Sequence, residues 1–337
     1  MKKVVTFGEV LLRLSTAAGE RLFQTDRIHT HFGGAEANVG ISLSHFGHET
    51  YFVSKVPKNA LGRAAEQHLK AHGVQTDFLL KGGNRLGTYY VESGIGPRSA
   101  QVTYDRMYSS VSQLDAEEID FEEIFQGASL FHVSGITAAL SPNMREIVRL
   151  SLKTAKECGV QTSFDFNYRA KLWSQQEAAE TIHSYLPYVD ICSCAELDAI
   201  YLLGIEQAEQ SLKESDKLIY YYEKIQQIYP NIVGLYSTFR QVFSASTHNL
   251  QGNYYTNGRM YQSKVYEIDP IVDRVGGGDA FAAGLLHGIL EEWKPEEIIS
   301  FAAAAAVLKH TIHGDCNAFT EAEIQQFSLS NPGVINR

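Results

Sequence analysis

Short runs rich in β-branched and aromatic residues alternate with longer segments of helical period through most of this 337-residue chain. Neighbouring parallel strands need a crossover connection, usually a helix, so this alternation is typical of βαβ units. We therefore expect an α/β fold in which helices flank a central, mainly parallel sheet. The predicted strands cover residues 3–6, 51–56, 130–133, 162–165, 189–193 and 232–236, and the predicted helices cover 35–46, 61–71, 143–158, 216–228, 279–292 and 295–309.

Two segments, residues 8–32 and 87–106, depart from this alternation. In the second, the stretches TYYVE and QVTYDR alternate bulky and polar residues around a turn with Gly and Pro, which predicts antiparallel strands outside the main sheet. Such strands form either a lid over an active site or a surface hairpin. A ligand-facing or interface role is favoured by the side chains gathered there: Tyr89, Tyr90, Tyr104 and Arg106.

Charge and hydropathy exclude several classes of partner. The formal net charge of −10, without any run of Lys and Arg, argues against a nucleic-acid-binding surface. The N-terminal apolar stretch is interrupted at Gly8 and Glu9, so it does not predict a signal peptide, and the longest apolar run, residues 301–308, is too short to span a bilayer. We expect one cytoplasmic domain over residues 1–337, with no membrane partner and with four reduced, structural cysteines.

Residues 273–284 read DRVGGGDAFAAG, in which three consecutive glycines lead into a segment of helical period. Gly276, Gly277 and Gly278 leave their backbone N–H groups accessible, and a helix that starts there adds the positive end of its dipole. An anion bound there would lie beside Asp279, a candidate base for phosphoryl transfer to a hydroxyl group. The motif alone favours this functional interpretation over a flexible glycine loop before an ordinary helix N-terminus.

Other nucleotide and hydrolase motifs are absent from the sequence. The chain has no GxxxxGK[ST] P-loop, no strand followed by GxGxxG and no GxSxG nucleophile elbow. These absences argue against a P-loop fold, a dinucleotide-binding Rossmann fold and an α/β-hydrolase.

The stretch DRVGGGDAFAAG resembles the signature DTxGAGDxFxxG of the PfkB family of carbohydrate kinases, with Arg274 for the usual Thr and Gly277 for the usual Ala. Since the family pattern has Ala there, we expect alanine to be tolerated at position 277, whereas valine should obstruct an anion. Residues 31–40, HFGGAEANVG, resemble the family's N-terminal GGxxxNxA motif. The two motifs lie in the expected order about 240 residues apart, and the resemblance extends from Gly8 to about Thr320.

The resemblance implies a ribokinase-like fold, in which a Rossmann-like α/β domain carries a small β-sheet lid, and a homo-oligomer formed through that lid. It implies ATP and Mg²⁺ as cofactors, with Asp279 as the catalytic base and Gly276 to Asp279 as the anion hole. The sugar hydroxyl groups would be bound by Gly33, Gly34 and Asn38.

The resemblance leaves the metal-supporting residues unidentified. The family's Asn-x-x-Glu motif falls on residues 195–198, where Ala195 replaces the Asn. Glu196 and Asp198 either act through water or lie on a solvated helix face. Mg²⁺ usually keeps several waters, so a dedicated cage of protein ligands is not required.

Residues 165–173, DFNYRAKLW, are similar to the DxNxRxxLW stretch of the 2-keto-3-deoxygluconate kinases, a subgroup of this family. They follow a predicted strand, at the position where ligands of open α/β sheets bind. The planar guanidinium of Arg169 could donate two charge-assisted hydrogen bonds to the carboxylate of a sugar acid. The structural alternative is a salt bridge from Arg169 to a local acid.

The same resemblance assigns further contacts. Substrate contacts fall on Asp165, Asn167, Asp315 and the lid residues Tyr89, Tyr104 and Arg106. Nucleotide contacts fall on Ser237, Thr238, Arg240 and Ala305, besides Gly276 and Gly278. For the tyrosines the substrate-facing role is favoured over a lid core, whereas tight helix packing explains the alanines around Ala305 equally well.

The expected activity is transfer of the ATP γ-phosphoryl group to the terminal hydroxyl group of 2-keto-3-deoxygluconate, which gives the 6-phosphate. An unperturbed Asp has a pKa of about 3.9, so proton transfer to Asp279 should come late in the reaction. Two alternatives stay open. One is a kinase of the same family that acts on fructose, ribose or a nucleoside. A neutral sugar would offer no carboxylate for Arg106 and Arg169 to bind. The other is a catalytically silent sugar-binding regulator on the same fold, against which Asp279 and its glycines argue.

Overall fold

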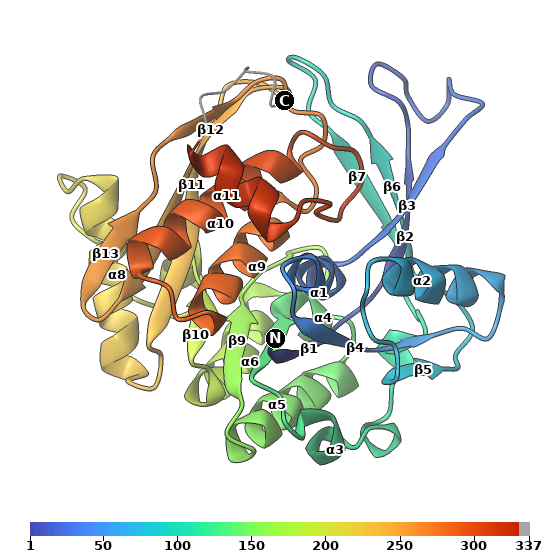
Figure 1. Ribbon diagram of the computed structural model, residues 1–337, viewed down its shortest axis with the longest axis horizontal. Coiled ribbons are helices and arrows are strands. Elements are labelled where there is room, and N and C mark those ends of the chain that lie inside the picture. Colours follow the sequence, from blue (N-terminus) through green and yellow to red (C-terminus); the bar gives the residue numbers. More distant parts are fainter. Residues whose placement is uncertain (330–337) are drawn as a thin grey trace.

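A large sheet covered by helices on both faces forms the body of the protein, and a smaller sheet projects from it (Figure 1). The computed structural model describes residues 1–329. The strands of the large sheet are β1 (Lys3–Phe7), β4 (Glu49–Val56), β5 (Leu79–Lys81), β8 (Leu130–Ser134), β9 (Gln161–Asp165), β10 (Ile191–Ser193), β11 (Gly234–Val242), β12 (His248–Thr256), β13 (Arg259–Gln262) and β14 (Tyr266–Ile268).

The strand order of this sheet is β13-β12-β11-β10-β9-β8-β1-β4-β5, and β14 pairs with β12. Every neighbouring pair from β5 to β11 is parallel, whereas β12 pairs antiparallel with β11, β13 and β14. The predicted α/β fold with a mainly parallel sheet is thereby confirmed. The carboxyl ends of the parallel strands lie at one edge, which is where ligands of open α/β sheets bind.

The α-helices of the described residues are α1 (Ala35–His45), α2 (Ala60–Ala71), α3 (Phe121–Phe125), α4 (Gly135–Ala138), α5 (Pro142–Glu157), α6 (Gln175–Tyr185), α7 (Glu196–Tyr201), α8 (Glu214–Ile228), α9 (Gly277–Leu290), α10 (Pro295–Lys309) and α11 (Glu321–Leu329). Successive residues of a strand point to opposite faces. Accordingly Val4 packs with α1, α9, α10 and α11, while Val5 packs with α3, α5, α6 and α8. The two hydrophobic cores therefore lie on opposite faces of the large sheet.

The smaller sheet is formed by the two segments that depart from the βαβ alternation. Its strands are β2 (Leu11–Ser15), β3 (His29–Gly33), β6 (Thr88–Glu92) and β7 (Gln101–Asp105), in the order β3-β2-β6-β7. Two pairs are antiparallel, as predicted, but the central pair, β2 with β6, is parallel. Each antiparallel pair joins strands that are close in the sequence, whereas the parallel pair joins two segments that are far apart in the sequence. A small core under this sheet contains Leu11, Tyr89 and Val91.

The largest departure from the predicted elements lies after residue 236. The predicted strand ends there because the apolar run ends, yet β11 continues to Val242 in a hairpin with β12. The last residues of β11 are exposed, so backbone pairing rather than burial extends the strand. The predicted domain reaches Arg337, but residues 330–337 lie outside the described residues.

None of the four cysteines forms a disulfide; Cys192, Cys194 and Cys316 are buried, as expected for structural thiols, while Cys158 is exposed. Among the described residues, no helix has the length and apolar character needed to cross a bilayer.

Candidate active site

A cavity of about 460 Å³ opens at the carboxyl edge of the parallel strands and extends under the smaller sheet. Most of the residues singled out from the sequence line this one cavity. They are Gly34, Asn38, Tyr89, Tyr104, Arg106, Asp165, Asn167, Arg169, Ser237, Thr238, Arg240, Gly276, Gly278, Asp279 and Asp315. Three candidates are not among the lining residues: Gly33, Gly277 and Ala305.

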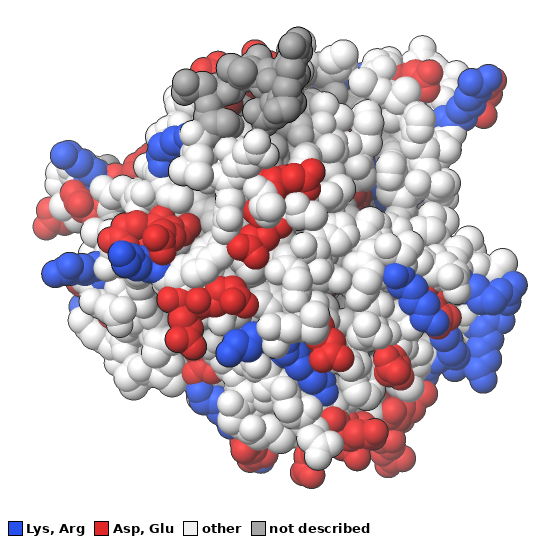
Figure 2. All heavy atoms as spheres, in the orientation of Figure 1, with Lys and Arg blue, Asp and Glu red and all other residues white. Residues whose placement is uncertain are grey.

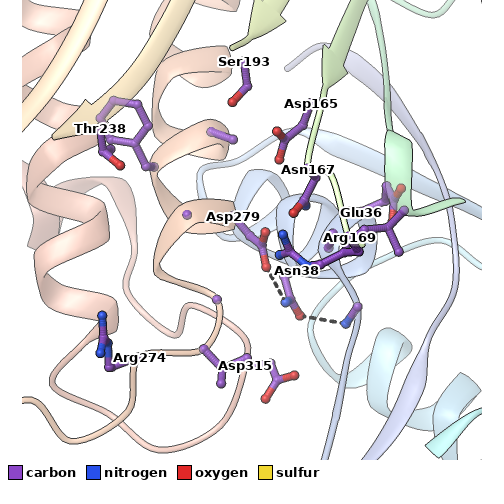
Figure 3. A pocket seen from close by; sticks show the side chains of 18 of the residues that line it. Glu36, Asn38, Asp165, Asn167, Arg169, Ser193, Thr238, Arg274, Asp279 and Asp315 are labelled. Carbon is purple, nitrogen blue, oxygen red and sulfur yellow. Dashed lines mark hydrogen bonds between the residues drawn. The ribbon is translucent and has the colours of Figure 1, made fainter. Parts of the chain in front are cut away.

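Two helix N-termini meet at the centre of the cavity. Asn38, in the first turn of α1, donates a hydrogen bond of 2.7 Å from Nδ2 to Asp279 Oδ2, in the first turn of α9 (Figure 3). The Asn38 Oδ1 atom accepts a bond of 3.3 Å from the backbone N–H of Gly34. The two glycine motifs, about 240 residues apart in the sequence, therefore form one site.

The glycines at this junction are required by close packing. Gly276 caps α9 with a φ of 82°, and a Cβ there would lie 1.7 Å from the carbonyl oxygen of Asp315. A Cβ at Gly34 would lie 1.9 Å from the carbonyl oxygen of Glu9, and one at Gly33 would lie 2.3 Å from Asp315 Oδ2. The lack of a side chain at Gly33 thus lets the end of β3 pack against Asp315, and Gly33 does not line the cavity.

The structure corrects the expectation that alanine is tolerated at position 277. A Cβ on Gly277 would lie 2.3 Å from Cε1 of His310. This ring is buried and is held by a bond of 2.6 Å from its Nδ1 to the carbonyl oxygen of Ala306. In contrast, a Cβ on Gly278 would meet no atom within 4 Å. Position 277 therefore faces the protein interior, and position 278 faces the cavity.

Burial raises the pKa values of four carboxyl groups in the cavity, and those of Asp279 and Asp165 come close to neutrality. Burial raises the pKa of Asp279 to about 6, with smaller contributions from the like charges of Asp315 and Glu36, and against the hydrogen bond from Asn38. Burial and the charge of Asp279 raise the pKa of Asp165 to about 7. A base with a pKa near neutrality accepts a proton from an alcohol more readily than an ordinary aspartate does.

Three arginines supply positive charge to the cavity: Arg169, Arg240 and Arg274. None of them takes part in a salt bridge with the described residues, and Arg169 donates only to the carbonyl oxygen of Tyr168, at 3.1 Å. The salt bridge considered for Arg169 is thus not formed. Asn167 adopts a φ of 40°, a left-handed conformation that Asn tolerates, in the turn that presents Arg169 (Figure 3).

Arg169, Arg240 and Arg274 place positive charge inside the cavity. On the face shown in Figure 2, acidic and basic side chains are interspersed. Burial, together with the charges of Arg274 and Arg169, lowers the pKa of Arg240. An anion bound between these groups would relieve their mutual repulsion.

The lid residues are held by partners within the protein. Arg106 pairs with the buried carboxylate of Glu9, to which its Nε donates at 2.8 Å, so its charge is already compensated. The Tyr89 hydroxyl group donates to Asp315. Asp315 also accepts from Arg13 Nη1 at 2.8 Å. These contacts differ from the expectation that Arg106 and Asp315 are free to bind substrate.

Arg13 and Glu36 are residues of the site that the sequence analysis missed. Arg13 lies on β2 and bridges Asp315 and Asp273, each at 2.8 Å. Glu36 is buried on α1, where its Oε1 accepts bonds of 2.7 Å from the hydroxyl groups of Ser134 and Thr137. A charged residue within an apolar stretch was the available signal for both.

The residues predicted to contact the nucleotide do not all line the cavity. Ser237, Thr238 and Arg240 line the cavity, but Ala305 is fully buried in α10. A Cβ on Gly284 of α9 would lie 3.4 Å from the Ala305 Cβ. The small side chain thus serves the packing of α10 on α9, which corrects the expected position of Ala305.

Of the two acidic residues that follow Ala195, one lines the cavity and the other does not. Asp198 lines the cavity, and its Oδ2 accepts a bond of 2.9 Å from the backbone N–H of Ala195. Glu196 lies outside it, where its Oε1 accepts a bond of 3.4 Å from Tyr221. Of these two acids, Asp198 alone therefore presents its carboxylate to the cavity, which Asp165 also lines.

Comparison with known proteins gives consistent results. Residues 1–322 match the family model described as pfkB family carbohydrate kinase. The chain is 32% identical over 335 residues to a 2-dehydro-3-deoxygalactonokinase of Haloferax volcanii, covering 99% of both chains. It superposes on a 2-dehydro-3-deoxygluconokinase of Thermotoga maritima with a TM-score of 0.94, at 41% identity, covering 98% of this chain and 100% of the other. A PfkB family carbohydrate kinase of Listeria grayi gives a TM-score of 0.93 at 46% identity, with the same coverage.

The contact of Gly277 with His310 gives a test of the packing. Gly277→Ala should lower the free energy of unfolding by about 1–3 kcal/mol, because the imidazole must move in a filled core. Gly278→Ala, the matched control, should not lower it, because its Cβ enters the cavity. Denaturant unfolding measures both. The destabilisation by Gly277→Ala should be smaller in a His310→Ala background, and strictly additive effects would contradict the contact.

Proposed function

This chain belongs to the pfkB family of carbohydrate kinases, and we propose that it transfers the γ-phosphoryl group of ATP to the terminal hydroxyl group of 2-keto-3-deoxygluconate. The observation that carries the proposal is the guanidinium of Arg169, which has no ion-pair partner among the described residues and lines the same cavity as Asp279 and Asn38. The carboxylate of a sugar acid would supply the missing partner. Relatives named for 2-dehydro-3-deoxy sugar acids, another name for the same class of compound, support this choice.

Asp279 is the proposed base. Its hydrogen bond with Asn38 fixes the carboxylate in the first turn of α9, and burial raises its pKa to about 6. A carboxylate with this pKa accepts the hydroxyl proton as the new P–O bond forms and the hydroxyl group becomes acidic. Gly34, Asn38 and Asn167 are the proposed contacts for the sugar hydroxyl groups, since all three line the cavity near this base.

The N-terminus of α9 is the proposed anion hole. The first N–H groups of a helix have no partner within the helix and carry the positive end of its dipole. Gly278 leaves the approach to these groups open. Arg240 and Arg274 line the same cavity and would neutralise the phosphates of ATP, so Arg274 takes an electrostatic role at the position where the family pattern has Thr.

Asp165 and Asp198 would hold Mg²⁺ in the same cavity. The donor set fits this ion, because Asp165 and Asp198 present carboxylate oxygens to the cavity and Mg²⁺ prefers oxygen ligands. When bound, the ion neutralises charge on the phosphates. Asp198 would thus compensate for the Asn that Ala195 replaces.

The smaller sheet is the proposed lid and also the proposed interface of a homo-oligomer. Tyr89, Tyr104 and Arg106 line the cavity from this sheet and would exclude water from the reacting groups. Its margins expose large apolar side chains, including Phe23, at 78% exposure, and Met107 and Tyr108, both at 69%. Burying such side chains against a second copy is favourable.

The pH profile tests Asp279. Because only the carboxylate accepts a proton and its folded pKa is about 6, kcat/KM should fall tenfold per pH unit as the pH drops below about 6. Steady-state ADP release from pH 5 to 9 measures the profile. Asp165 titrates nearby, so the apparent pKa belongs to the pair.

Asp279→Asn is the control for this profile. It should keep the fold and lower kcat by about 10²–10⁴, and the residual rate should lack the acid limb. Near-normal turnover in this variant would remove Asp279 from the mechanism. Absence of any ADP release from the wild type with sugar acids would favour the silent regulator.

Arg169→Ala tests the sugar-acid assignment. Loss of a charged hydrogen bond worth about 1.5–3 kcal/mol should lower kcat/KM for the sugar acid roughly 10- to 150-fold. A neutral analogue, with an alcohol in place of the carboxylate, should be a poor substrate that the substitution hardly affects. Arg169→Lys should restore only part of the loss, since the ammonium lacks the planar fork.

Arg240→Ala is the matched control in the same cavity. It should raise the KM for ATP and should not discriminate charged from neutral sugars. Equal losses for both sugars in Arg169→Ala would mean that Arg169 is structural, and the fructokinase-like alternative would then be preferred. The substrate panel should contain the gluconate- and galactonate-derived acids, because relatives of both names exist.

Sedimentation tests the interface. Tyr108→Asp, on the margin of the smaller sheet, should shift the protein towards the monomer, because a charge would be buried in the contact. The control Ile228→Asp, at another exposed apolar side chain, at the end of α8, should not. A wild-type protein that sediments as a monomer at micromolar concentration would contradict the proposal.

A further inference from the structure

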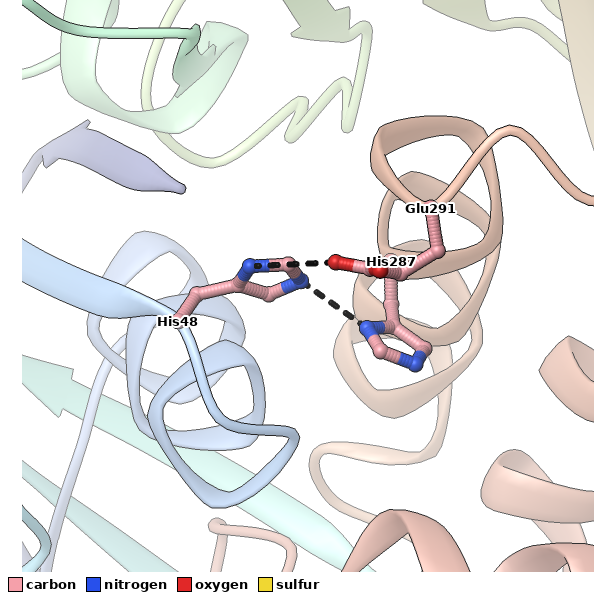
Figure 4. A group of neighbouring side chains, drawn as sticks. All are labelled: His48, His287 and Glu291. Atoms are coloured by element: carbon pink, nitrogen blue, oxygen red, sulfur yellow. Dashed lines mark hydrogen bonds and ion pairs between the residues drawn. The ribbon is translucent and has the colours of Figure 1, made fainter. Parts of the chain in front are cut away.

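A histidine pair lies at the opposite end of α9 from the proposed active site. His287, in the last turn of α9, and His48, in the turn before β4, are both buried, and His48 Nε2 lies 2.9 Å from His287 Nδ1 (Figure 4). His287 follows Asp279 by eight positions, which places it about 12 Å further along the helix. The pair therefore does not touch the groups proposed to react.

The outer nitrogens of the pair both face carboxylates. His48 Nδ1 lies 4.0 Å from Glu291 Oε1, and His287 Nε2 lies 3.5 Å from Glu321 Oε2. Neither outer nitrogen has a hydrogen-bond partner, although both are buried. The four groups thus form a row from Glu291 through the two rings to Glu321.

The two rings carry too few protons to form a hydrogen bond at each of the three contacts in this row. A neutral imidazole carries one proton, so two neutral rings share two protons among four ring nitrogens. One of these two protons occupies the contact between the rings, and one remains for the two outer nitrogens. One ring nitrogen must then turn its lone pair towards a carboxylate, which is repulsive. A cation between the rings would remove this conflict, because both inner nitrogens would then face the cation and the outer nitrogen of His287 could donate a proton to Glu321. Glu291 could turn from His48 Nδ1 towards the cation.

We propose that His48, His287 and Glu291 bind a divalent transition-metal ion such as Zn²⁺. Each offers one ligand atom, and these atoms all lie within 4.8 Å of one another. At Zn–N distances of about 2.0–2.1 Å, two tetrahedral ligands lie about 3.3 Å apart, so the rings need to separate by only a few tenths of an ångström. The Glu291 side chain is 39% exposed and has room to approach.

The surroundings fit a metal ligand of this kind. Glu321 faces the second nitrogen of His287, and metal-binding histidines commonly donate their other N–H to a carboxylate. The rings of Phe46, Trp293 and Phe301 pack at 4.9–5.3 Å from the His287 ring and fix its orientation. Glu291 is the C-cap of α9, where the helix dipole favours a cation.

The chemistry of the donors sets the class of ion. Imidazole with one carboxylate suits Zn²⁺, Ni²⁺, Co²⁺ and Cu²⁺ rather than Mg²⁺, which prefers oxygen ligands alone. The site is therefore distinct from the proposed Mg²⁺ site. An ion bound at this site would connect the end of α9 to the turn before β4 and, through Glu321, to α11. We therefore expect the ion to affect the stability of the fold and not phosphoryl transfer.

The test uses the full-length protein after removal of metals with a chelator, in buffer with excess Mg²⁺. Titration with Co²⁺ should give one equivalent bound per chain, with visible d–d absorption of a four-coordinate ion. Zn²⁺ should displace Co²⁺ and raise Tm by about 2–5 °C, because it binds only the folded state. No absorption band together with no rise in Tm would overturn the proposal.

Substitutions of the acidic residues around the histidine pair test where the ion binds. Glu291→Gln and Glu321→Gln change partly exposed side chains, so both should fold, and each should weaken Zn²⁺ binding by about 10- to 100-fold. Glu292→Gln, the adjacent acid, is the matched control and should bind as the wild type does. If Glu291→Gln binds as tightly as the wild type, the ion lies elsewhere and the proposal fails. If Tm rises only on acidification and not with Zn²⁺, the row binds a proton instead, which also overturns it.

Discussion

The buried guanidinium of Arg13 connects the parts from which the candidate site is assembled. It lies on β2 of the smaller sheet and bonds Asp273, just before the glycines, and Asp315, in the loop after α10. Asp273 in turn accepts from the backbone N–H groups of Val275 and Gly314, both at 3.1 Å, and Asp315 accepts from Tyr89. Burial alone would lower the pKa of Arg13, but the two carboxylates raise it, so the charge is retained. Removing Arg13 would leave two buried carboxylates without their cation, which is strongly destabilising.

This connection holds the N-terminus of α9 against that of α1, and the electrostatics of the site follow. The carboxylate of Asp279 is stabilised by Asn38 and by the helix N-terminus, yet its burial, with the like charges of Asp315 and Glu36, keeps its pKa high. Positive charge is supplied from the strand ends by Arg169 and Arg240 rather than by the outer surface. The negative net charge of the chain is therefore compatible with the proposed anionic nucleotide, because the local field in a cavity outweighs the net charge.

The sequence predicted the central residues of the site better than their partners. Asp279, Asn38 and Arg169 come together as their motifs indicate. Arg106 does not differ from Arg169 in any local pattern, but the fold places Glu9 beside Arg106 and leaves Arg169 without such a partner among the described residues. Ala305 could not be assigned from its type, because a small side chain serves a nucleotide and a helix contact equally well.

The sequence by itself determined the alternation of strands and helices, the two glycine motifs and hence the family, because these depend on periodicity and on residues that need no distant partner. Only the tertiary structure decided which side of the glycine triplet faces the cavity, since His310, far along the chain, occupies the space next to Gly277. It also decided the parallel pairing of β2 with β6 and the meeting of His48 with His287. These features are contacts between segments remote in sequence, and no local pattern of residues encodes the partner that burial brings to each of them.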